Sequence, residues 1–322
     1  MTVRFLCNQD INIPAGQSSP MTPLGEIAEA VMAWAKDITG RGHQADVYHS
    51  GTNGTFDGVR YFSRSAYHGG DGMTINLMSP DIAPRELTWY LTYNMDDAKL
   101  NFKGFEGVLM PSQWAVDNFK VKPGFSRVDP FGKRYRNVHY LPHGYDSGQI
   151  YPGTKIPKQC LYAAPVDKGL DAVLAAWPEV YQGHPDATLI LATTAKSDLP
   201  GIVMVEDMSV ENVNKLFRSS DVWVYPNAGE ELTGLSAIKA QAAGSVPLYY
   251  PTMALIAIVR QGVKTSPDKL AEDWIDILNN EQKRNDIRKQ LAKEHFPDWA
   301  QSTSYILDCA EKISFVLESP AK

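Results

Sequence analysis

DVWVYPNAGEELTGLSAIKAQAAGSVPLYYP, residues 221–251, is the most informative stretch of the chain. Its first apolar run, residues 221–226, predicts a strand, and a polar turn with two glutamates follows it. A helical pattern then opens at Thr233–Gly234, and a second apolar run at 246–251 predicts another strand. A strand, a helix and a strand in this order indicate a parallel sheet with helices packed on it.

The same alternation runs along nearly the whole chain. The predicted helices include 24–42, which ends in glycine, and a helical tail from Lys269 onward. The other predicted strands are 3–7, 45–49, 73–78, 107–111, 138–142, 159–165, 187–193 and 202–207. This order favours α/β architecture with largely parallel sheets covered on both faces.

The length of 322 residues favours two domains, and the best linker candidate is SGQIYPGTKIPK, residues 147–158, which has two prolines and two glycines. We therefore expect an N-terminal Rossmann-like domain over 1–148 and a C-terminal one over 149–300. A helix over 301–322 would complete the chain. Parallel sheets of this kind bind ligands at the carboxyl ends of their strands.

Composition excludes several other classes of protein. A hydrophobic content of 43% with near-average glycine and proline indicates a folded globular chain. The net charge of −6 gives no global attraction to nucleic acid or to an anionic membrane. No signal peptide or membrane-spanning run is present, and the three widely spaced cysteines fit free thiols, so we expect a cytoplasmic protein. No metal-ligand spacing is present, and no bound cofactor is expected.

The turn after the first strand has two interpretations on local physics alone. Gly234 lets a ligand approach the backbone, and the helix that follows offers free N–H groups suited to a diphosphate. Glu231 would then accept hydrogen bonds from sugar hydroxyls. The alternative is an acidic helix N-terminus that the helix dipole stabilises. Local physics favours this second interpretation.

Resemblance changes that balance. The stretch resembles the donor motif of retaining, nucleotide-sugar-dependent glycosyltransferases of the GT-B fold, in the GT4-like superfamily (glycosyl transferases group 1). The positions that fall in register are Pro226, Asn227, Glu231, Gly234, Ala240, Gly244 and Pro247. PVDKGLDAVLAAWPEVYQGHPDATLIL (165–191), GVLMPSQWAVDNF (107–119), VHYLPHGYD (138–146) and residues 25–48 resemble further family segments in the expected order.

The resemblance implies a fold and a set of roles. The fold is GT-B: two Rossmann-like parallel-sheet domains that face a central cleft, with a C-terminal helix crossing back to the N-terminal domain. Glu231 is implied as the catalytic residue that positions the transferred sugar, without a bound metal and without an obvious protein nucleophile. The implied donor-binding residues are Lys168, Glu230, Thr233, Gly234, Leu235 and Lys239.

Two positions depart from the family pattern. Ala163 stands where the family often has an arginine, and Lys239 stands where a second glutamate accepts hydrogen bonds from the ribose hydroxyls. A lysine can only donate. Three interpretations of Lys239 stay open: it contacts a ribose oxygen or the diphosphate, it marks an altered donor, or it is a surface residue of a decayed site.

Residues of the N-terminal half are weaker candidates for an acceptor side. His68 lies in the glycine-rich segment YHGGDG, and Asp96 and Asp97 lie in LTYNMDDAK, where a capping or solvated pair is the favoured interpretation. His143 replaces a family asparagine, and packing at the crossover is favoured for it.

Residues 119–136 carry six basic residues against one acidic residue. A solvated loop is the favoured interpretation. The alternative is a surface that guides a polyanionic acceptor: a phospholipid surface, a phosphorylated glycan or DNA with modified bases. The residues singled out for this role are Lys133, Arg134 and Arg136.

We therefore expect a retaining hexosyl- or pentosyltransferase that uses a UDP-, GDP- or ADP-sugar as co-substrate. Its acceptor would be a glycan, a lipid or a modified nucleic acid, and peripheral membrane contact stays open. The alternatives are a nucleotide-sugar epimerase and a non-catalytic nucleotide-sugar or glycan-binding protein of the same fold.

Overall fold

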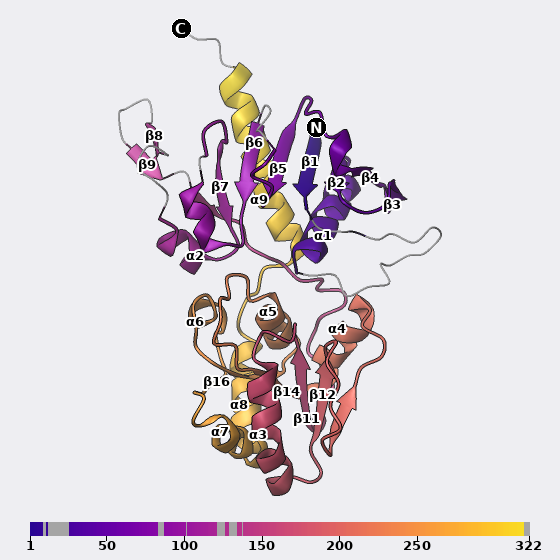
Figure 1. Ribbon diagram of the computed structural model, residues 1–322, viewed down its shortest axis with the longest axis vertical. Helices are drawn as coiled ribbons and strands as arrows, with labels where there is room; N and C mark the ends of the chain where they lie inside the picture. The colour runs from indigo at the N-terminus through magenta and orange to yellow at the C-terminus, as the bar shows by residue number, and fades with distance from the viewer. Residues whose placement is uncertain are drawn as a thin grey trace. The chain divides into compact units, whose positions relative to one another are not determined.

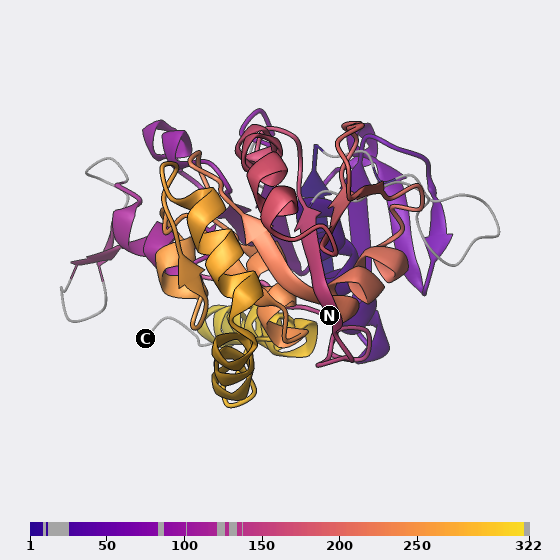
Figure 2. The same ribbon diagram turned by 90° about the horizontal axis from the view of Figure 1, so that it is seen from below.

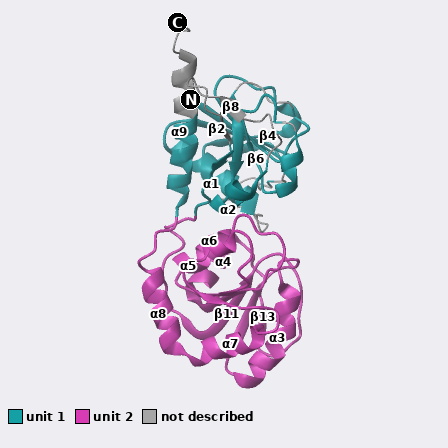
Figure 3. Ribbon diagram, turned by 90° about the vertical axis from the view of Figure 1, so that its left-hand side faces the viewer, with its two compact units in different colours: residues 1–144, 297–322 teal, residues 145–296 magenta. Residues whose placement is uncertain are grey.

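The computed structural model describes residues 1–8, 11, 26–82, 87–100, 102–120, 126–128, 134–136 and 138–318, and in 126–128, 134–136 and 310–318 it describes the backbone alone. The chain divides into two compact units. Unit 1 comprises Met1–Gly144 with Pro297–Lys322, and unit 2 comprises Tyr145–Phe296 (Figure 3). The sequence places these boundaries after residues 148 and 300.

Unit 1 is built on an eight-stranded sheet in the order β10-β7-β6-β5-β1-β2-β4-β3 (Figure 1). All its neighbouring strands are parallel except β3 and β4. The strands are β1 Thr2–Cys7, β2 Gln44–His49, β3 Gly54–Phe56, β4 Val59–Ser63, β5 Met73–Leu77, β6 Leu87–Leu91, β7 Gly107–Met110 and β10 Val138–Tyr140. The central strands are buried on both faces, as continuous apolar runs require.

Strands β3 and β4 form a hairpin that the sequence analysis does not predict. Asp57 and Gly58 connect them, with φ of 48° and 78°. A two-residue hairpin turn with both φ angles positive favours Asp-Gly. This dipeptide is therefore the signal that identifies the hairpin.

Helices α1 (Glu26–Gly40) and α9 (Trp299–Glu318) pack against each other in unit 1. Trp34 Nε1 donates to Ser302 Oγ at 2.6 Å, and Ser302 Oγ donates to Pro142 O at 2.5 Å. These two bonds attach α9 both to α1 and to the segment that follows β10. The remaining elements of the unit are η1 Arg64–Ala66, η2 Met95–Lys99, α2 Gln113–Asn118, β8 Ser126–Val128 and β9 Arg134–Arg136.

Unit 2 contains a six-stranded parallel sheet in the order β13-β12-β11-β14-β15-β16. Its strands are β11 Ile156–Ala163, β12 Thr188–Ala192, β13 Ile202–Met204, β14 Ser220–Tyr225, β15 Val246–Tyr249 and β16 Val263–Lys264. Its helices are α3 Leu170–Gly183, α4 Val210–Ser219, α5 Leu235–Ala242, α6 Leu255–Ile258, α7 Leu270–Asn279 and α8 Glu281–Leu291.

Two apolar cores cover the two faces of the unit 2 sheet. In one, Trp177 of α3 and Trp274 of α7 pack with ring centroids 5.4 Å apart, and α3 lies beside α7 in Figures 1 and 2. In the other core, Phe217 of α4 and Ala237 of α5 pack beneath Trp223 of β14. Both faces are therefore covered by helices, as the βαβ alternation predicts.

In each sheet the chain adds strands first on one side of its first strand and then on the other side. In unit 1 the direction reverses between β1 and β5, and in unit 2 it reverses between β11 and β14. In folds of this kind, the connections that leave the carboxyl ends of two such strands run to opposite sides of the sheet. Open α/β sheets bind their ligands at this point.

Candidate active site

The loops after β11 and β14 bring the predicted donor residues together at the unit 2 switch point. Gly169 follows β11, has a φ of +95° and begins α3. A Cβ on Gly169 would lie 2.4 Å from Pro226 O, in the loop after β14. Only glycine permits this approach of the two loops.

Lys168 spans the gap between these loops. Its Nζ donates to Glu230 O at 2.5 Å and lies 3.9 Å from Glu231 Oε2. The side chain of Lys168 keeps 29% of its surface exposed. A cation is thus held at the edge of the switch point with part of its surface open to an anionic group.

Glu231 is buried, with 4% of its surface exposed. Its Oε1 accepts hydrogen bonds from Gly234 N at 2.9 Å, Thr233 N at 3.3 Å and Thr233 Oγ1 at 3.2 Å. Its Oε2 accepts one from Tyr225 OH at 2.5 Å. The carboxylate therefore satisfies N–H groups at the start of α5, so the acidic helix N-terminus and the sugar-positioning interpretation apply to the same side chain.

Gly234 is the N-cap of α5, with a φ of +60°. A Cβ there would lie 2.9 Å from Ile258 Cδ1 of α6. The left-handed backbone therefore favours glycine, and a side chain at this position would also make Ile258 shift, besides hindering any approach by a ligand. Thr233 and Leu235 are buried beside it, while Glu230 is exposed.

Lys239 lies in the second turn of α5 and is 7% exposed. The interpretation of Lys239 as a helix surface residue is therefore wrong. A lysine is seldom buried to this extent unless its ammonium group has a partner. Ala163, the other departure from the family pattern, is the last residue of β11, and its carbonyl oxygen lies 3.4 Å from Ser236 Oγ of α5.

Asp96 and Asp97 have local partners in unit 1. Asp96 is exposed and pairs with Lys99 at 2.7 Å, which lowers the pKa of its carboxyl. Asp97 Oδ2 accepts hydrogen bonds from Thr92 Oγ1 at 2.6 Å and Tyr90 OH at 3.0 Å. These contacts hold the loop after β6 in place, which is the structural interpretation of the two carboxylates.

His68 lies in the loop between β4 and β5, two residues after the 3-10 helix η1. Arg134 and Arg136 lie in β9, which pairs with β8 and precedes β10. Lys133 lies outside the described residues. The described contacts therefore assign no acceptor-side role to His68, Arg134 or Arg136.

His143 is fully buried among Trp34, Tyr93 and Trp299, and its Nε2 lies 2.7 Å from Tyr93 OH. Burial lowers the pKa of its imidazole to about 3. The ring is thus a neutral packing element next to the unit boundary, as favoured from the sequence.

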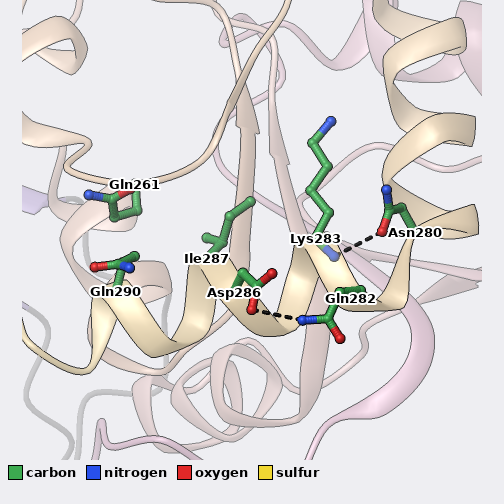
Figure 4. A pocket seen from close by; sticks show the side chains of 7 residues that line it. All are labelled: Gln261, Asn280, Gln282, Lys283, Asp286, Ile287 and Gln290. Atoms are coloured by element: carbon green, nitrogen blue, oxygen red, sulfur yellow. Dashed lines mark hydrogen bonds between the residues drawn. The ribbon is translucent and has the colours of Figure 1, made fainter.

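A shallow polar depression of about 410 Å³ lies on the outside of unit 2, along α8 (Figure 4). Gln282 Nε2 donates to Asp286 Oδ1 at 2.8 Å within it. Its lining residues are Gln261, Asn280, Gln282, Lys283, Asp286, Ile287 and Gln290. None of the predicted donor residues lines this depression.

In the part of the chain that the structure describes, no group of three or more histidine, cysteine, aspartate or glutamate side chains could hold a metal ion. Within the same residues, every helix is too short or too polar to cross a membrane.

The sequence analysis assigns no role to three residues of the site. Tyr225 ends β14 and bonds to Glu231, and Gly169 allows the loops to meet. Asn227 is buried, with its Oδ1 accepting from Gly229 N at 2.9 Å and its Nδ2 without a hydrogen-bond partner. In the sequence, Gly169 can be recognised as the glycine after Lys168, and Asn227 as the polar residue after Pro226. No local pattern identifies Tyr225.

Comparison with solved structures identifies the architecture. WaaG, a glycosyltransferase involved in lipopolysaccharide biosynthesis, superposes with a TM-score of 0.68 over 96% of this chain and 99% of its own, at 13% identity. Sucrose-phosphate synthase from Thermosynechococcus elongatus reaches 0.73 over 98% and 99% of the two chains, also at 13% identity. The chain has the GT-B fold. The predicted fold class is thereby confirmed.

Anabaena HepE, solved in complex with UDP and glucose, also has this GT-B fold, with a TM-score of 0.64 over 97% of this chain and all of its own at 12% identity. No family model matches the sequence, and no curated protein matches it. At these identities the likeness concerns the fold.

Proposed function

We propose that this chain is a retaining, metal-independent glycosyltransferase that takes its sugar from a nucleotide-sugar donor bound at the unit 2 switch point. One observation carries the proposal. Lys168, the N-terminus of α5 and the Glu231 carboxylate lie together at the carboxyl ends of the neighbouring strands β11 and β14. Cation and helix N–H groups suit a diphosphate, and a carboxylate oxygen suits sugar hydroxyls. The GT-B structures of glycosyltransferases support it.

Charge develops on the diphosphate as the sugar leaves. Lys168 and the N-terminus of α5 would stabilise that charge before and during bond breaking. Thr233, Gly234 and Leu235 shape this end of the helix, and Glu230 holds Lys168 through its carbonyl oxygen.

Glu231 would orient the transferred sugar. Its Oε2 accepts one hydrogen bond, from Tyr225, and an ionised carboxylate oxygen accepts two. The four donors around the carboxylate fix its position. A carboxylate so engaged suits positioning rather than nucleophilic attack, which fits transfer on the front face of the sugar.

In this proposal unit 2 holds the donor and unit 1 binds the acceptor. The acceptor is a glycan, a lipid or a modified nucleic acid. Cys7, Cys160 and Cys309 are free thiols, which supports a reducing, cytoplasmic compartment.

A donor screen tests the proposal. UDP-, GDP- and ADP-sugars are titrated by calorimetry, and sugar release or transfer is followed by mass spectrometry. We expect one nucleotide to bind at micromolar concentration and its sugar to be transferred or slowly hydrolysed. Interconversion of the sugar on an intact donor would instead identify an epimerase, and binding without any turnover would identify a binding protein.

The Glu231 variant must separate chemistry from folding. Glu231→Ala would leave the N–H groups of Thr233 and Gly234 without their acceptor, so Glu231→Gln is the better change, because its amide oxygen still accepts. We expect turnover to fall by about a hundredfold with little loss of stability. Glu272→Gln, at an exposed position in the first turn of α7, is the matched control and should retain turnover. Equal turnover in the two variants would contradict the role of Glu231.

A further inference from the structure

An ion pair crosses the carboxyl edge of the unit 1 sheet. Arg64 follows β4, Asp81 follows β5, and Arg64 NH2 donates to Asp81 Oδ1 at 2.6 Å. In the sheet these strands are separated by β1 and β2, so they lie three strand spacings, or about 14 Å, apart. The pair therefore passes over the carboxyl ends of β1 and β2, beside the point where the winding of unit 1 reverses.

Short ordered turns hold both partners. Arg64 begins the 3-10 helix η1, where Tyr67 N donates to Arg64 O at 3.2 Å. Ahead of Asp81, Ser79 N donates to Asn76 Oδ1 at 3.0 Å, and Asn76 Nδ2 donates to Ser79 O at 3.1 Å. This turn holds Met78 at a φ of +50°. A left-handed backbone at a non-glycine residue is unfavourable and persists only where the surroundings impose it.

The guanidinium of Arg64 is not fully satisfied by Asp81. Its Nε is buried and has no hydrogen-bond partner, although 26% of the side chain is exposed. Asp81 is 66% exposed, so solvent weakens its attraction to Arg64 and the pair contributes little to stability. An arginine presents a fork of donors that matches a phosphate, which binds more strongly than one exposed carboxylate.

We propose that Arg64 binds the phosphate of a phosphorylated acceptor, which displaces Asp81. This rests on the proposed function, because the acceptor is what unit 1 would hold while unit 2 holds the donor. Asp81 keeps the guanidinium in place until the ligand arrives and competes with it. Removing the arginine and removing the aspartate should therefore have opposite effects on ligand binding.

The probes are glucose 6-phosphate, inorganic phosphate and unphosphorylated glucose, titrated calorimetrically into the full chain. We expect the wild-type protein to bind the two phosphates and not glucose. Arg64→Gln should weaken glucose 6-phosphate about tenfold or more, because a charge-assisted pair is lost. The glucose 6-phosphate affinity of Arg64→Lys should lie between those of the wild type and Arg64→Gln. Asp81→Asn should bind glucose 6-phosphate about threefold more strongly, because the competing carboxylate is removed.

The NMR signal of the Arg64 Nε–H group gives a second readout, assigned by its absence in Arg64→Gln. Phosphate should shift this signal and glucose should not. Lys36→Gln removes another exposed ion pair of unit 1, 2.7 Å long to Asp57, and should change nothing.

UDP affinity should be equal in all these variants. If the wild-type protein did not bind UDP, the proposed function would be contradicted, while Arg64-dependent binding of phosphate could still be observed. An unshifted Nε signal, equal phosphate affinity in Arg64→Gln, or weaker binding in Asp81→Asn would overturn the Arg64 proposal.

Discussion

Charged side chains lie at both the amino edge and the carboxyl edge of the unit 2 sheet, but their pairing and burial differ. At the amino edge, Asp221 is 2% exposed and is enclosed by Arg284, whose Nε lies 3.1 Å from Oδ2, and by Arg288, which donates to Oδ1. At the carboxyl edge, the Glu231 carboxylate accepts from uncharged donors, and its nearest cation, Lys168, is partly exposed and 3.9 Å away. One edge closes its charges within the protein, and the other leaves a cation accessible.

This difference separates stability from binding. The amino edge also holds Lys155, whose Nζ donates to Ala243 O at 2.7 Å and Arg218 O at 2.8 Å, near the ends of α5 and α4. A donor at a helix C-terminus stabilises carbonyl oxygens that have no partner within the helix. Changes at the amino edge should therefore alter the free energy of unfolding, and changes at the carboxyl edge should alter ligand affinity.

The largest effect is expected for Asp221→Asn. Arg284 and Arg288 would keep their buried charges without a counterion, which costs about 3–5 kcal/mol. Urea denaturation measures this loss, and the donor affinity of the remaining folded protein should be unchanged. Asp276→Asn, which breaks the exposed pair to Lys283, is the control and should cost less than about 1 kcal/mol. Equal losses in the two variants would erase the difference between the edges.

Lys155→Met should have the next largest effect, and one that depends on pH. Burial, with a smaller contribution from Arg288 and an opposing one from Asp221, lowers the pKa of Lys155 to about 7. In the unfolded chain the lysine is protonated up to about pH 10.4, so between these values unfolding takes up a proton and wild-type stability rises with pH.

The variant lacks this titration and loses donors to buried carbonyl oxygens, about 2 kcal/mol at pH 9. The stability gap between wild type and Lys155→Met, from urea unfolding, should therefore shrink as the pH falls from 9 to 7. A gap that widens instead would show that the ammonium form is the one that stabilises the helix ends.

Lys168→Met tests the carboxyl edge. Loss of the cation should weaken binding of the nucleotide diphosphate about tenfold, measured by calorimetry, with unfolding free energy within about 0.5 kcal/mol of wild type. Lys158→Met, at an exposed pair with Asp186 in the same unit, should leave affinity unchanged. If Lys168→Met lost stability without a change in nucleotide affinity, the carboxyl edge would contribute to stability rather than to binding.

The fold could be predicted from sequence because parallel strands buried on both faces are continuous apolar runs. The strand over Thr188–Ala192 and the helix over Glu26–Gly40 follow directly from such patterns. The strand Leu87–Leu91 and the short Val263–Lys264 were missed. The first was detectable, because LTWYL is a β-branched and aromatic run with Pro84 ahead of it and Asn94 behind it. The two-residue strand exists only because Leu248 and Tyr249 pair with it.

The candidate site could be predicted only in part. Lys168 and Glu231 carry recognisable neighbours along the chain. The bond from Tyr225 to Glu231 and the approach of Gly169 to Pro226 join separate loops, and they depend on strand order. No local pattern records which strands are adjacent, so such contacts appear only in three dimensions.

Lys239 should give the smallest but most specific effect. The side chain is buried in α5, about one turn from the helix end that we propose for the diphosphate, and the family resemblance implies a ribose contact at this position. Lys239→Glu restores an acceptor for ribose hydroxyls, and we expect the affinity ratio between ribo- and 2′-deoxyribonucleotide donors to rise about threefold. Calorimetric titration of UDP and dUDP measures this ratio.

Lys239→Met is the control, because it removes the charge without offering an acceptor and should not raise the ratio. Equal ratios in all three proteins would show that Lys239 acts through packing within unit 2 rather than through the nucleotide.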